Sequence, residues 1–493
     1  MTFDNKIREY VVKFNANDEE TVVQAIDNAH AAEWMIENVP YFECPDKIIE
    51  ETYYFRWWTY RKHIKRTCDG YVITEFHPDV PWAGLHNTIN AASGHHLNEG
   101  RWLKNSDEYL RDYIRFWFTP KKGNIYSYSS WIVAAVYDYC TVTRDFSIAI
   151  ELLAEFDKYY AEVESRNLTP HGLFWSNDDR DAMEMSISGS GLRPTLNSYM
   201  YANAVAISKI AEKAGYMDLR RKYEQKAETL KQAIQTYLWD DKTQFFKVLP
   251  LESKDFPATL SFDDISRQRN VRELIGYIPW SFDLPSTKHQ PAWKYLMDFN
   301  HFYAPFGPTT AEKNHSEYLK SGTHECLWNG PSWPFATTQT LNSLIHYLHA
   351  EKNESNISKS DFMTLIGNYA KSHYRTTEDG KIINWIDENL HPETGEWVSR
   401  NILREWGWRE GKGGYERGKD YNHSTFCDLV IRGICGVEVS NEEKLCVNPL
   451  VPEGMWDYFY LDNLHYLDKK VTIAYDRTGE KYSRGKGLSV IVE

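Results

Sequence analysis

Two segments of this chain concentrate carboxylates in different surroundings. In residues 171–201, four acids fall within seven positions: Asp178, Asp179, Asp181 and Glu184. Glu184 stands between Met183 and Met185. Burial beside apolar groups raises the pKa of a carboxyl, which then stays protonated near neutral pH. The segment therefore suggests a proton donor at Glu184, and a solvated acidic loop is the alternative interpretation.

A second acidic segment, residues 384–401, lies between a tryptophan-containing run and a turn. Its four acids are Asp387, Glu388, Glu393 and Glu396. A general base must be ionised and within hydrogen-bond reach of the water that it activates. A carboxylate facing a pocket from this loop could hold such a water, and an exposed turn is the alternative interpretation.

Aromatic side chains make up 15% of the 493 residues. Flat rings suit sugars, because the C–H groups of a sugar face pack on a ring while the hydroxyls reach polar neighbours. Trp328 and Trp333 flank a polar turn that includes Asn329, where a helix over residues 333–350 is expected to begin. This pair could form a sugar platform, and a packed aromatic core is the alternative.

Residues 82–102 gather further side chains that could contact a sugar: Trp82, His95, Glu99, Arg101 and Trp102. His95 and Glu99 are four positions apart and could share one helix face. The chain has no H-E-x-x-H motif, phosphate-binding loop, dinucleotide fingerprint or G-x-S-x-G elbow. Its seven cysteines include no C-x-x-C pair, which argues against a disulfide framework or a zinc knuckle. We therefore predict paired carboxylates that act with no cofactor and no metal.

The charge balance restricts the partners of the chain. With 56 basic and 70 acidic residues the net charge is −14, which argues against binding to nucleic acid or to an anionic membrane. No apolar run approaches the roughly 18 to 20 residues of a membrane helix. The first twenty residues lack a signal-peptide pattern. We expect a cytoplasmic protein, or a periplasmic or secreted one whose signal peptide has been removed.

Helical periodicity predicts the elements that must position these side chains. About a dozen amphipathic segments run from residue 17 to residue 377, with a last one near 421–434. Residues 17–20 resemble a helix cap, and a further helix is expected over 262–276. Short loops favour antiparallel hairpins. We predict a mainly α fold, a closed toroid of six hairpins with a pocket at one end; a bundle or an open superhelix fits the periodicity nearly as well.

The C-terminal tail has a different pattern. Short alternating runs over 444–447, 456–460, 470–474 and 488–492 are separated by turn signals and predict a small antiparallel β-sheet. We expect a barrel domain over residues 1–440 and a small β-sheet appendage over residues 441–493 that packs on it.

Four segments resemble motifs of the six-hairpin (α/α)6-barrel glycosidases, the clan of trehalases, processing α-glucosidases, mannosylglycerate hydrolases and some β-L-arabinofuranosidases. They are residues 182–188, 276–279, 328–333 and 388–395. The last, E-N-L-H-P-E-T-G, is similar to the E-N-Y-x-P-x-T-G motif whose glutamate is the general base. The first occupies the place of G-M-D-N-S-P-R, whose aspartate is the general acid. The resemblance implies an (α/α)6 toroid and a glycoside hydrolase.

The resemblance also implies roles for single residues. Glu184 would be the general acid, with Asp181 as the alternative because Glu replaces the usual Asp, and Glu388 would be the general base. Asn329 stands where the family usually has Arg, which argues against a trehalase or a processing glucosidase. An inverting reaction needs the two carboxyls about 6.5–9.5 Å apart. They are 204 positions apart in the sequence, so only a closed fold can bring them together.

A dead-end pocket would favour removal of one terminal sugar from an oligosaccharide or glycoside. Two other functions stay open at this point. A sugar isomerase or epimerase on a similar barrel would use histidines as proton shuttles, here His95, His96 and His324. A carbohydrate-binding protein without catalysis would keep the rings but place no constraint on the paired acids.

Overall fold

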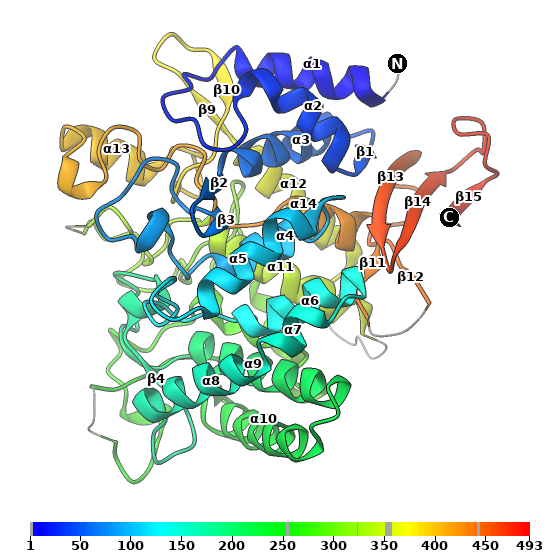
Figure 1. Cartoon of the computed structure of the whole chain (residues 1–493). Coiled ribbons are helices and arrows are strands. Elements are labelled where there is room, and N and C mark those ends of the chain that lie inside the picture. Colours follow the sequence, from blue (N-terminus) through cyan, green and yellow to red (C-terminus); the bar gives the residue numbers. More distant parts are fainter. Residues whose placement is uncertain (1–2, 253–255, 323, 351–356, 441–443) are drawn as a thin grey trace.

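The computed structural model describes residues 3–252, 256–322, 324–350, 357–440 and 444–493 (Figure 1). Helices dominate it, and six of them form a closed inner ring in which each helix packs against the next and the last packs against the first. In ring order these are α4 (Ser93–Gly100), α6 (Ile132–Thr143), α9 (Pro194–Lys213), η5 (Leu274–Phe282), α11 (Pro334–His349) and α14 (Cys427–Leu429), which η8 (Val430–Ile434) continues.

A second set of helices alternates with the inner ones along the chain. Each precedes one inner helix: α3 (Lys47–Lys62), α5 (Ser106–Phe118), α8 (Leu153–Asn167), α10 (Met217–Tyr237), η6 (Thr287–Tyr295) and α12 (Lys359–Lys371). Two N-terminal helices, α1 (Phe3–Asn15) and α2 (Ala31–Asn38), cover α3. The six pairs make the toroid that the periodicity predicted.

Local sequence signals explain where several helices begin. The Asp46 carboxylate accepts from the backbone N–H groups of Ile48 and Ile49 and caps α3. Proline occupies the first position of α9 and of α11, where its missing N–H costs no hydrogen bond. A capping box between Ser358 and Asp361 starts α12.

The inner ring closes through a buried polar cluster between α4 and α14. The Glu99 carboxylate accepts hydrogen bonds from the backbone N–H groups of Phe426, Cys427 and Asp428, at 2.7–3.0 Å. Asp428 in turn accepts from Arg101 Nη2 and from Trp102 Nε1, each at 2.7 Å. The first N–H groups of a helix have no acceptor within the helix, so they need one from elsewhere. A carboxylate at this position also complements the helix dipole.

The C-terminal strands form one antiparallel sheet at the edge of the helical body (Figure 1). Its order is β1 (Tyr41–Glu43), β13 (Tyr458–Tyr466), β14 (Lys469–Asp476) and β15 (Gly487–Val492). The sheet therefore includes one strand from the N-terminal part of the chain. A separate pair, β11 (Val437–Glu438) and β12 (Cys446–Val447), spans the predicted boundary at residue 440. That division into domains stays a prediction.

Two predicted helices are wrong. Residues 17–20 do not cap a helix, because α1 already ends at Asn15 and the Asp18 carboxylate is buried between the ammonium groups of Lys62 and Lys419, at 3.0 and 2.5 Å. Within 262–276 only the two ends are helical, since Glu273 forms an antiparallel bridge with Ala311.

Within the described ranges, no helix combines the length and apolar character needed to cross a lipid bilayer.

The Glu99 closure predicts a stability effect. Glu99→Ala removes three hydrogen bonds to a charged acceptor and leaves buried N–H groups without a partner. We expect the free energy of unfolding to fall by about 3 kcal/mol, measured as a lower urea midpoint by tryptophan fluorescence. Glu99→Gln keeps one acceptor oxygen, so its urea midpoint should lie between those of the wild type and of Glu99→Ala. The exposed Glu453→Ala is the control, and equal midpoints for all variants would contradict the closure role.

Candidate active site

One cavity of about 260 Å³ brings the two acidic segments together. Its wall combines carboxylates, cations and rings, among them Glu75, Glu184, Glu388, Lys412, Arg417, Phe76, Trp82, Tyr128, Trp333 and Tyr421. A polar centre with aromatic walls is the composition expected of a sugar site.

Arg417 is the central cation of this cavity. Its Nη2 donates to both carboxylate oxygens of Glu388, at 2.8 and 2.9 Å, and its Nη1 lies 3.0 Å from Glu325. The guanidinium also lies over the Trp82 ring, 4.9 Å from the ring centroid. All three charged groups are buried. The guanidinium therefore compensates two buried carboxylates and fixes the orientation of Glu388.

Glu184 lies on a turn that follows the short 3₁₀ helix η3 (Asp178–Asp181). Its neighbour Met183 is buried, whereas Met185 is exposed. Burial raises the pKa of Glu184 to about 7, and the negative charges of Asp179 and Glu388 act in the same direction. A carboxyl with this pKa is protonated in about half of the molecules at pH 7 and can donate that proton.

The segment from Glu325 to Ser332 connects the two acidic loops. The Trp328 N–H donates to the Glu184 carbonyl at 3.2 Å. On the other side, Ser332 and Leu390 exchange two backbone hydrogen bonds, and Asn389 Nδ2 donates to the Glu325 carbonyl at 3.0 Å. Backbone bonds of one segment thus fix the loops of both carboxyls.

Glu75 is a third carboxyl that the sequence analysis missed. It lies two residues after β3 (Gly70–Ile73) and accepts a hydrogen bond from the Tyr421 hydroxyl. Burial raises its pKa to about 8, and Glu388 and Glu184 add to this rise. The signal was an isolated acid in an otherwise uncharged run, residues 71–76. Arg417 had no comparable signal, because it lies among other charged residues in a glycine-containing loop.

Two of the four predicted tryptophans line the cavity. Trp82 is 37% exposed, and Trp333 is buried in its wall. Trp328 stacks on Trp333, with ring centroids 4.6 Å apart and an angle of 16° between the ring planes. The Trp328 ring therefore supports Trp333 and does not itself line the cavity.

Asp181 and Asn329 do not line the cavity either. Asp181 is buried and accepts from Arg193 Nε at 2.6 Å and from the hydroxyls of Ser129 and Ser176. Asn329 Nδ2 donates to the Lys320 carbonyl at 2.7 Å and holds its own loop. Asp181 is thus paired with a cation outside the cavity. Of the two candidates for the general acid, Glu184 is the one that lines the cavity.

The structure places four of the predicted sugar contacts outside this cavity: His95, Glu99, Arg101 and Trp102. Glu99, Arg101 and Trp102 instead close the inner ring, where they bind Asp428 at the start of α14. The same residue types could bind either a helix end or a ligand. His95 packs edge-on against the rings of Trp131 and Phe335, with centroids 4.8 and 4.7 Å away, and lines a different cavity.

One group beside the cavity has metal-ligating atoms. Those of His324, Glu325 and Cys326 lie within 4.8 Å of one another. Glu325, however, is already paired with Lys412 at 2.9 Å and with Arg417 at 3.0 Å. Two cations on the same carboxylate compete with a metal ion, so this donor set fits a structural ion-pair cluster better.

The charge of Glu388 predicts a titration effect at Glu184. Replacing Glu388 by Gln removes a nearby negative charge, so the pKa of Glu184 should fall from about 7 but stay above its ordinary 4.5, since burial remains. Infrared difference spectra of the protonated carboxyl would measure this pKa, with Glu184→Gln assigning the band. Glu396→Gln, an exposed change on the same loop, should leave the pKa unchanged. Titration of wild-type Glu184 at its ordinary value would contradict the burial argument.

Comparison with protein families gives a match over most of the chain. The profile described as the mannosylglycerate hydrolase MGH1-like glycoside hydrolase domain matches residues 85–424. A curated uncharacterized protein of Borreliella burgdorferi is 26% identical over 157 residues, which cover 31% of this chain and 30% of that protein.

Solved structures show the same fold. A chain titled sialidase is 37% identical, with a TM-score of 0.89, and the match covers 100% of this chain and 43% of that chain. A mannosylglycerate hydrolase from Thermus thermophilus in complex with glucose is 10% identical, with a TM-score of 0.51, over 76% of this chain and 98% of that chain. This chain therefore spans less than half the length of the sialidase, and its match to the Borreliella protein covers less than a third of either chain.

Proposed function

The chain belongs to the mannosylglycerate hydrolase MGH1-like family of glycoside hydrolases, and from this premise we propose that it hydrolyses a terminal glycosidic bond with inversion. The resemblance to six-hairpin glycosidases is thereby confirmed at the level of family and fold. The observation that carries the mechanism is a single cavity in which one carboxyl is buried with a raised pKa and another is paired with Arg417.

In the proposed reaction Glu184 is the general acid. Its proton passes to the glycosidic oxygen as the bond from that oxygen to the anomeric carbon breaks. Glu388 is the general base and takes a proton from the water whose oxygen bonds to the anomeric carbon from the opposite face. The reaction needs about 6.5–9.5 Å between the carboxyls to admit this water. Each turnover leaves Glu184 ionised and Glu388 protonated, and solvent exchange restores both.

The aromatic wall supports a sugar as the occupant. The rings of Trp82 and Trp333 can cover sugar faces, while the Tyr128 hydroxyl and Glu75 offer polar partners to sugar hydroxyls. Glu75 carries a proton at neutral pH, so it can donate to a sugar oxygen without adding a third negative charge. A pocket closed at the inner ring would favour the release of one terminal sugar from an oligosaccharide or glycoside.

The isomerase alternative loses its main support. Of the three histidines that it would use, only His324 lines the cavity, and His96 is held by Tyr113 and the Asn422 carbonyl. For the substrate class we propose terminal glycosides, and the names of the relatives suggest mannosyl and sialyl conjugates as the first screening set.

Stereochemistry and variants together test this proposal. Proton NMR of the first-formed product should show the anomer opposite to that of the substrate. Glu388→Gln should lower kcat about a thousandfold with sugar binding retained, because the charge is lost and the shape is kept. Glu184→Gln should lose least activity on nitrophenyl glycosides, whose leaving groups need little protonation.

Glu396→Gln serves as the matched control on the loop of Glu388 and should keep wild-type kinetics. Retention of configuration would instead indicate a covalent intermediate. Full activity of both Glu184→Gln and Glu388→Gln would show that these carboxyls take no part in the reaction. Sugar binding by the wild type without any turnover would favour the carbohydrate-binding alternative.

The raised pKa of Glu184 predicts the basic limb of the pH–rate profile. Because the acid must be protonated, kcat/KM should fall as pH rises through about 7. On a substrate with an activated leaving group, the profile of Glu184→Gln should lack this basic limb. Glu75→Gln shows which of the two acids sets the limb: if Glu184 sets it, this variant should keep it. A limb that disappears in Glu75→Gln and persists in Glu184→Gln would show that Glu184 does not set it.

A further inference from the structure

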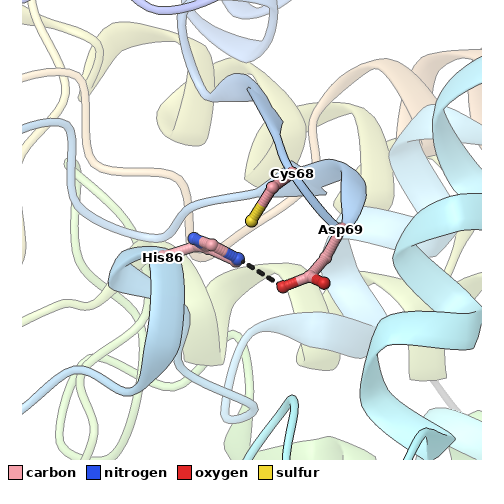
Figure 2. A group of neighbouring side chains, drawn as sticks. All are labelled: Cys68, Asp69 and His86. Atoms are coloured by element: carbon pink, nitrogen blue, oxygen red, sulfur yellow. Dashed lines mark hydrogen bonds and ion pairs between the residues drawn. The ribbon is translucent and has the colours of Figure 1, made fainter.

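A cluster of three potential metal ligands lies outside the cavity. The turn between β2 (Ile64–Thr67) and β3 carries Cys68 and Asp69, and the 3₁₀ turn η2 (Leu85–Asn87) presents His86 to them (Figure 2). One sulfur, one carboxylate oxygen and one ring nitrogen lie within 4.8 Å of one another. The proposed hydrolysis uses none of these side chains.

We propose that Cys68, Asp69 and His86 bind a zinc ion. Thiolate, imidazole and carboxylate are the ligands that zinc takes in proteins, at about 2.0–2.3 Å, so tetrahedral neighbours are about 3.5 Å apart. The Cys68 side chain points toward the His86 ring, and His86 Nε2 lies 2.7 Å from Asp69 Oδ2 (Figure 2). Small rotations of exposed or half-buried side chains bring the three atoms to bonding distance, and water completes the tetrahedron.

The backbone holds two of these ligands in place from the hairpin side. Thr67 Oγ1 accepts from the Asp69 N–H at 3.0 Å and donates to the Gly70 carbonyl at 2.8 Å. Gly70 adopts a φ of +92°, and a Cβ there would lie 2.5 Å from the Asp112 carboxylate. The turn is therefore fixed with Cys68 and Asp69 adjacent.

The loop that carries His86 is equally constrained. His86 and Asn87 both have left-handed backbone conformations, with φ of 60° and 64°. The Asn87 amide donates to the Phe76 and Pro78 carbonyls and accepts from the Val80 N–H at 3.0 Å. These bonds hold the strained pair and aim the imidazole at the hairpin turn.

Lys122 supplies the outer partner that zinc carboxylates usually have. Its ammonium donates to Asp69 Oδ1, whereas Oδ2 faces His86. Metal binding would use Oδ2 and leave the lysine contact intact. As the zinc–sulfur bond forms, the Cys68 thiol releases its proton to solvent. The His86 Nε2 proton that faces Asp69 also leaves to solvent, the neutral ring carries its proton at Nδ1, and the Nε2 lone pair binds the metal. No change of oxidation state is involved.

Such a site would fix one wall of the active-site cavity. The metal would join residue 68 to residue 86, and the loop between them carries Glu75, Phe76 and Trp82. All three line the cavity, so the ion would limit the movement of the tryptophan against the sugar. The site itself does not depend on the proposed hydrolysis.

Cobalt(II) is the spectroscopic probe for this proposal. The full chain, freed of metal with a chelator, should bind one Co²⁺ and develop a thiolate-to-cobalt charge-transfer band that Zn²⁺ removes. Cys68→Ser should abolish the band. His86→Asn, which tolerates the left-handed backbone, should weaken Zn²⁺ binding at least about tenfold in calorimetry.

Cys446→Ser changes the other exposed cysteine and is the matched control. This variant and the inactive Glu388→Gln should bind both metals as the wild type does. Zinc should also raise the unfolding midpoint of the wild type but not of Cys68→Ser. The proposal would be overturned if the wild type bound neither metal. It would also be overturned if Cys68→Ser and His86→Asn bound zinc as tightly as the wild type does.

Discussion

The closure of the inner ring between α4 and α14 is the constraint on which the rest of this fold depends. Glu184 and Glu388 lie in loops of different hairpins, so they share a cavity only if the ring is complete. Closure uses a carboxylate on three backbone N–H groups and an ion pair at Asp428, all buried. Interactions of this kind specify one arrangement, because any slip between the two helices would leave charges without partners.

Loops, and not helices, determine the geometry of the proposed catalytic groups. The segment from Glu325 to Ser332 contacts the backbone of both acidic loops and leads directly into Trp333. Arg417 then fixes the Glu388 side chain and packs on Trp82. The barrel supplies a rigid frame, and hydrogen bonds between loops set the positions of acid, base and ring within it.

Periodicity predicted the helices of the toroid, but a bundle or an open superhelix fits the same periodicity nearly as well, and the resemblance to six-hairpin glycosidases indicated the closed ring. The acid and base candidates followed from local motifs, since Glu184 has apolar neighbours and Glu388 lies in an eight-residue match. Glu75 and Arg417 belong to no motif, and their roles arise from contacts with residues 346 and 29 positions away. Glu99 and Arg101 lie at a helix end and not in the cavity, a difference that the sequence could not show because the same polar residues suit a ligand or a helix end.

The long separation between the closing partners has a consequence for biosynthesis. Glu99 and Arg101 meet residues 426–428 only after more than 320 further residues have been added. On a ribosome, the early hairpins must therefore wait with unpaired charges and apolar faces exposed. The β1 strand has a similar delay, because its partner β13 follows more than 400 residues later in the chain. The order of synthesis therefore leaves the first hairpins without their closing partners for most of translation.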